Sequence, residues 1–144
     1  MPSKTTLPDN PGIVLVITYL LLFAVNSLVL YLGHLWFPQY IVLGAASVNP
    51  TWAILHSMGI LALLNTFAIP FIREIETQRH KLFSNTDWMV TYFALNFVGI
   101  WLITRLAQQL GFGITSWVVA AALAFVLDLI QGAAMMQLEK LRRS

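Results

Sequence analysis

Cysteine is absent from this 144-residue sequence, and charged residues are scarce. Without cysteine there is no disulfide bond, no thiolate metal site and no cysteine nucleophile. Charged residues make up only 10% of the chain, whereas soluble domains carry about a quarter. The chain therefore has too little charge to cover a surface that faces water. Its formal net charge of +2 gives no indication of nucleic-acid binding.

The motifs of common catalytic sites are also missing. There is no glycine-rich phosphate loop, no serine–histidine–aspartate set and no HExxH zinc motif. We therefore expect a protein that is not an enzyme and that holds no metal and no cofactor.

Hydrophobic residues, by contrast, make up 58% of the chain, and its mean hydropathy is +0.76. They gather in four runs, at about 13–36, 52–72, 88–110 and 114–136. At the rise of an α-helix the first run extends about 36 Å, enough to cross a hydrocarbon core of about 30 Å. The sequence thus predicts an all-α, multi-pass membrane protein with four transmembrane helices. Residues 1–12 and 137–144 are predicted to be short tails outside the membrane.

The first and third runs contain similar sequences. Residues 23–31 read FAVNSLVLY and residues 93–101 read FALNFVGIW, with Phe, Ala and Asn at matching steps. Each copy is followed by a short break and a second apolar run. This repetition predicts two helical hairpins that begin on the same side of the membrane, as parallel repeats.

The basic residues predict the orientation. With the N-terminus inside the cell, seven of the eight lie on the cytoplasmic side: Lys4, Arg73, Arg79, Lys81, Lys140, Arg142 and Arg143. Only Arg105 falls near the other face. By the positive-inside rule, both termini are expected in the cytoplasm. The expected location is the inner (plasma) membrane of a bacterial cell.

Polar side chains inside the runs are the candidates for a site, because a bilayer cannot solvate them. Each run supplies one such amide or carboxylate, and the four lie at similar depth: Asn26, Asn65, Asn96 and Asp128. Gln131 and Ser57 flank this polar layer. A carboxylate at the centre of a membrane helix costs about 2.5–3.5 kcal/mol. Asp128 therefore serves either as a proton or cation site with the asparagines as neutral ligands, or as a packing group that fixes the register of the helices.

Two histidines offer a further interpretation. His34 and His56 lie on consecutive runs, and a pair of histidines on adjacent helices can hold a b-type haem. The alternative is a structural or interfacial role for each of them, and the residues alone leave both open.

Short stretches of the chain resemble a family of small four-span bacterial membrane proteins that are commonly described as phage-holin-like. These stretches read NSLVL at 26–30, NFVGI at 96–100 and LLNTFAIP at 63–70. The chain departs from the family at Gln39, Ile69 and Asp128. The resemblance implies oligomers that open lesions in a membrane.

Three functions follow from these observations. The first is a holin-like membrane protein that acts through helix packing and self-association, with the lipid bilayer and further copies of itself as partners. The second is a small proton or cation channel or transporter that uses Asp128 and the asparagine layer. The third is a haem-bearing or accessory subunit that works with other membrane subunits.

Overall fold

The computed structural model describes residues 11–143. Its elements, in chain order, are α1 (Pro11–Trp36), β1 (Ile41–Leu43), α2 (Pro50–Arg79), α3 (Asn85–Arg105), α4 (Ala107–Leu110), β2 (Phe112–Ile114) and α5 (Trp117–Arg143). The predicted N-terminal tail falls largely outside the described residues, together with Lys4.

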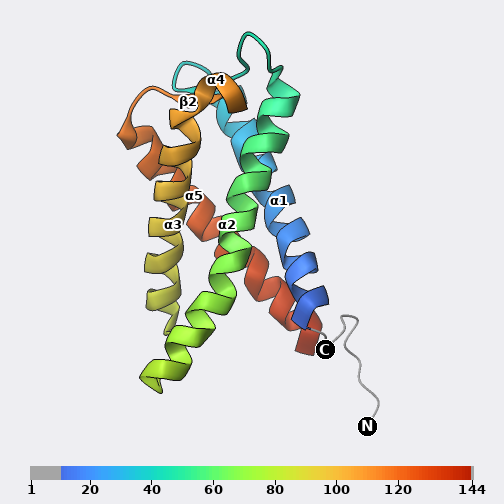
Figure 1. Cartoon of the computed structure of the whole chain (residues 1–144), viewed down its shortest axis with the longest axis vertical. Coiled ribbons are helices and arrows are strands. Elements are labelled where there is room, and N and C mark those ends of the chain that lie inside the picture. Colours follow the sequence, from blue (N-terminus) through green and yellow to red (C-terminus); the bar gives the residue numbers. More distant parts are fainter. Residues whose placement is uncertain (1–10, 144) are drawn as a thin grey trace.

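Four of these helices are long and apolar enough to cross a membrane: Gly12–Trp36, Pro50–Arg79, Asn85–Arg105 and Trp117–Gln137. The prediction of an all-α chain with four helices that could span a membrane is therefore confirmed. The helices alternate in direction, so that α1 begins and α5 ends at the end of the bundle where α2 gives way to α3 (Figure 1). We call this the open end, and the opposite end, where the strands lie, the ribbon end. Helix α1 packs on α2, α3 packs on α5, and α1–α5 and α2–α3 contacts join the two pairs.

Helix α2 extends beyond the predicted membrane span. The span was predicted to end near residue 72, and the helix passes through Pro70 and continues as far as Arg79. Proline removes one backbone hydrogen bond without ending this helix. Hydrogen bonds one turn apart support the polar extension, since Gln78 Nε2 donates to Glu74 Oε1 over 3.2 Å. The helix then ends at His80, which adopts a left-handed conformation with φ 54°.

The boundaries of the last two spans also differ from the prediction. Helix α3 begins at Asn85 rather than 88, because Ser84 and Asp87 form a capping box. It ends at Arg105, and a separate turn, α4, covers 107–110. Helix α5 begins at Trp117 rather than 114 and continues to Arg143, and the part of it that could cross a membrane ends at Gln137, close to the predicted end at 136. The late start has a clear cause, since residues 112–114 form strand β2.

The two strands make an antiparallel ribbon that the sequence did not predict. Ile41 pairs with Ile114, Val42 with Gly113 and Leu43 with Phe112. The segment at 37–49, whose role the sequence left undecided, is thus ordered by a segment far along the chain. Gly111 precedes the ribbon with φ 80°, and a side chain there would meet Ala53 Cβ at 2.8 Å. The turn therefore requires glycine.

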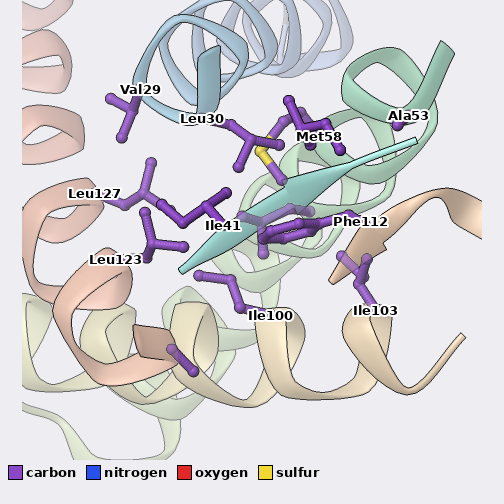
Figure 2. Close-up of a cluster of buried hydrophobic side chains, with 13 residues drawn as sticks. Val29, Leu30, Ile41, Ala53, Met58, Ile100, Ile103, Phe112, Leu123 and Leu127 are labelled. Carbon is purple, nitrogen blue, oxygen red and sulfur yellow. The ribbon is translucent and has the colours of Figure 1, made fainter. Parts of the chain in front are cut away.

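The ribbon seals the ribbon end of the bundle with apolar side chains. Ile41 is 4% exposed and Phe112 is fully buried. Figure 2 shows both among side chains from the long helices, which include Leu30, Met58, Ile100 and Leu127. The hydrophobic core therefore fills the ribbon-end half of the bundle, while the buried polar side chains described next lie closer to the open end.

Candidate functional site

Four amide side chains, one from each long helix, meet inside the bundle. Asn26 comes from α1, Asn65 from α2, Asn96 from α3 and Gln131 from α5. The three asparagines are fully buried and Gln131 is 3% exposed. A bilayer offers these groups no water, so each must find its hydrogen-bond partner within the protein.

The four amides satisfy one another in a closed ring, which we call the amide ring. Asn26 Nδ2 donates to Asn65 Oδ1 over 3.2 Å, and Asn65 Nδ2 donates to Asn96 Oδ1 over 2.9 Å. Asn96 Nδ2 donates to Gln131 Oε1 over 3.0 Å, and Gln131 Nε2 donates back to Asn26 Oδ1 over 2.7 Å. Every member donates once around the ring and accepts once, so the ring ties all four helices together at one level.

Asn65 is the most connected member of the ring. Its Oδ1 also accepts a hydrogen bond from Gln131 Nε2 over 3.0 Å. Its backbone carbonyl accepts a hydrogen bond from the Tyr92 hydroxyl over 3.0 Å. Helices α2 and α3 are also in close contact one turn away, at Gly99, where a Cβ would lie 2.7 Å from Leu61 Cδ1.

The predicted polar layer is thus rearranged in the structure. Asn26, Asn65 and Asn96 are brought together, but their fourth partner is Gln131, which was expected only to flank the layer. Ser57 lies eight residues from Asn65 along α2, which is about 12 Å at helical rise, so it is not part of this level. Its buried hydroxyl has no partner among residues 11–143.

Asp128 stands apart from the amide ring. It lies on α5 three residues before Gln131, about 4.5 Å further toward the ribbon end. Only 8% of the residue is exposed. Within the described part of the chain its carboxyl group makes no hydrogen bond and no ion pair. A carboxyl group without a partner in an apolar environment destabilises the folded protein, so we expect Asp128 to have a role other than stability.

Asp128 lies on the wall of a cleft with a volume of about 570 Å³. The cleft lies between the open-end halves of α2, α3 and α5, with Leu22 of α1 also in its wall. Arg73 and Asn85 line it toward the open end, and Asp128 marks its deep end. Gln131 of the amide ring also lines it, and most of its other side chains are apolar or aromatic: Ile69, Trp88, Met89, Tyr92, Leu129, Met135 and Met136. We call it the acidic cleft.

A second groove runs between α1 and α5 near the ribbon end, with a volume of about 630 Å³. Its wall is almost wholly apolar, and no acidic or basic side chain lines it. Two of the described residues that line it, Thr115 and Ser116, carry aliphatic hydroxyl groups. Of the two, only the acidic cleft combines a binding volume with a group that can change charge.

The two candidate haem ligands are both engaged by near neighbours. His34 Nδ1 donates to the carbonyl oxygen of Ile41 over 2.8 Å, which ties the end of α1 to the ribbon. The His56 ring stacks on Trp52 of its own helix, with ring centroids 5.3 Å apart. Among the described residues no group of three His, Cys, Asp or Glu side chains is placed to hold a metal ion.

Comparison of the chain with models of protein families, with curated proteins and with solved structures finds no match.

We predict that Asn65→Ala lowers the free energy of unfolding in detergent by about 2 kcal/mol, because several hydrogen bonds of up to about 1.7 kcal/mol each are lost. Ser57→Ala is the matched control on the same helix. It removes a buried hydroxyl without a partner and is expected to leave stability level or slightly higher. Reversible unfolding in mixed micelles measures both. Equal losses for the two variants would contradict the amide ring.

Proposed function

We propose that the protein is a non-enzymatic membrane carrier of protons or cations, and that Asp128 is the residue that binds them. The observation that carries this proposal is the carboxyl group of Asp128, which is 8% exposed, lies at the deep end of the acidic cleft and has no partner among residues 11–143. An ionisable side chain within a membrane span usually marks a pathway for protons or ions.

The corresponding position in the other hairpin argues against a packing role for Asp128. Asn65 and Gln131 occupy equivalent places in the amide ring, and three residues before them lie Ala62 and Asp128. Ala62 is fully buried and has no polar group. Since α2 carries an apolar residue three positions before its ring member, the amide ring does not depend on a carboxyl group at that place in a helix.

Access to Asp128 from one side favours a carrier over an open channel. The acidic cleft extends from Asp128 toward the open end, whereas the apolar cluster and the strand ribbon fill the ribbon end. A channel needs a continuous polar path across the membrane. A carrier exposes its site to one side of the membrane at a time. One of its states must therefore be closed at one end, as this bundle is.

Self-association, which the resemblance to holin-like proteins implies, has less support than the carrier. Polar side chains are the usual means of joining helices within a membrane. Here the four amides are used within one chain, in the amide ring. We therefore place the working site inside a single copy.

We further propose that the bundle consists of two parallel repeats and that the open end faces the cytoplasm. In α1, Asn26, Val29 and Leu30 are buried, and Asn96, Gly99 and Ile100 are buried at the same spacing in α3. The shift along the chain that relates Asn26 to Asn96 also relates β1 to a segment that overlaps β2, the strand with which β1 pairs. The concentration of basic residues at 73–81 and 140–143 supports a cytoplasmic open end.

The orientation has a direct test in this cysteine-free chain. A cysteine introduced at Asn85 is expected to react with an impermeant thiol reagent only after the cells are opened, because the 80–85 turn faces the cytoplasm. A cysteine at Ser47, beyond the ribbon, is expected to react in intact cells. Reaction of the Asn85→Cys variant in intact cells would reverse the orientation.

The carrier proposal is tested by proton flux in vesicles that contain the purified protein and an internal pH dye. We expect the native protein to dissipate an imposed pH gradient, and Asp128→Asn to lose at least nine-tenths of that rate. The variant is expected to stay folded, since asparagine keeps the shape of the side chain and removes the cost of a buried charge.

The matched control is Glu74→Gln, which removes a carboxyl group of the exposed extension of α2. It changes the net charge by the same amount as Asp128→Asn and is expected to leave the flux unchanged. Equal flux from the native protein and folded Asp128→Asn would refute the assignment of Asp128 as the carrier site.

A further inference from the structure

The walls of the acidic cleft indicate the kind of cation that it accepts. Its volume of about 570 Å³ lies within the range of about 300–1,000 Å³ that is typical of sites for small organic molecules. A proton or an inorganic ion needs no such volume. Most of the lining side chains are apolar, so an occupant that fills the cleft must itself carry an apolar body.

Aromatic side chains line the cleft between its mouth and Asp128. Trp88 and Tyr92 stack on each other one turn apart on α3, with ring centroids 5.8 Å apart and planes 15° apart. The faces of such rings attract cations, and Trp is the strongest of them. Met89, Met135 and Met136 add flexible thioether side chains, which adapt to ligands of different shape.

A lone carboxyl group does not make a site for Ca²⁺ or Mg²⁺. Ca²⁺ and Mg²⁺ take six or more oxygen ligands. No cluster of three His, Cys, Asp or Glu side chains exists among the residues that the structure describes. A weakly hydrated organic cation, by contrast, needs one counter-charge and apolar walls, and the acidic cleft supplies both.

Arg73 and Asp128 make the two ends of the acidic cleft opposite in charge type. Arg73 is exposed at the end of the cleft where α3 begins, and Asp128 is buried at the deep end. An anionic ligand would meet its only positive partner at the mouth, and its apolar body would then lie beside the buried acid. A cationic ligand instead places its charge at the Asp128 carboxylate, and its apolar body then lies along the apolar and aromatic wall between Asp128 and the mouth.

We propose that the acidic cleft binds a lipophilic organic cation of single positive charge, with its charged centre at the Asp128 carboxylate and its apolar body against Trp88 and the methionines. This inference rests on the proposed role of Asp128 as a carrier site and names its substrate class. Charge balance is simple, because a neutral carboxyl group releases one proton as one monovalent cation binds.

Tetraphenylphosphonium is the probe that tests this proposal, and tetraphenylborate is its matched control, with the same shape and the opposite charge. Equilibrium dialysis with the full-length protein in detergent measures binding of both ions, and a pH dye in weakly buffered solution measures proton release. We expect saturable binding of tetraphenylphosphonium with release of up to one proton per cation. Tetraphenylborate is expected to bind at least tenfold more weakly.

Variants separate the acid from the apolar walls. Asp128→Asn is expected to weaken tetraphenylphosphonium binding at least tenfold and to abolish proton release, while Asp128→Glu restores much of both. Trp88→Leu is expected to weaken binding several-fold and to leave proton release per bound cation unchanged. Glu74→Gln again serves as the control for net charge.

The outcomes distinguish this inference from the carrier proposal. Binding of tetraphenylphosphonium without any proton flux in vesicles would support the inference and remove the carrier. Proton flux that depends on Asp128, without binding of tetraphenylphosphonium, would overturn the inference and leave the carrier. Equal binding of the two probe ions, or undiminished binding to both Asp128→Asn and Trp88→Leu, would also overturn the inference.

Discussion

The absence of water from the membrane interior is the constraint that shapes this molecule. A buried polar group there has no water to bind, and four amides satisfy one another by closing a ring. Apolar packing in lipid gives helices little preference for one arrangement, because lipid tails are as apolar as leucine. The amide ring supplies that preference, since only one rotation of each helix brings all four amides to the same point.

The remaining structure divides at the amide ring. Toward the ribbon end, the strands and the apolar cluster fill the space between the helices, and Phe112 is fully buried there. Beside the ring and toward the open end, α2, α3 and α5 leave the acidic cleft, which Gln131 of the ring itself lines. The two hairpins contribute alike to the ring but differ one turn away, where Ala62 in one hairpin corresponds to Asp128 in the other. The carboxyl group of Asp128 therefore lies at a position where the two hairpins differ, and it is not part of the amide ring that joins them.

The sequence predicted the features that depend on composition and missed those that depend on contact. The four spans and the three buried asparagines followed from hydropathy and from the position of single polar residues. Gln131 was assigned to the edge because depth alone cannot tell which face of a helix a residue occupies; Asp128, three residues earlier, faces about 60° away from it. The strand ribbon pairs Ile41 with Ile114. No local sequence pattern indicates three-residue strands that are so distant from each other along the chain. The capping box at Ser84 and Asp87, in contrast, could have been read from the sequence.

The central claim is that Asp128 holds a proton that a cation replaces. Infrared difference spectroscopy of the protein in vesicles, with and without tetraphenylphosphonium, observes this exchange directly. The account predicts that the cation removes the carbonyl band of one protonated carboxyl group and adds carboxylate bands, and that Asp128→Asn lacks both changes. A spectrum in which no carboxyl band changes, or one in which Asp128→Asn shows the same changes, would contradict it.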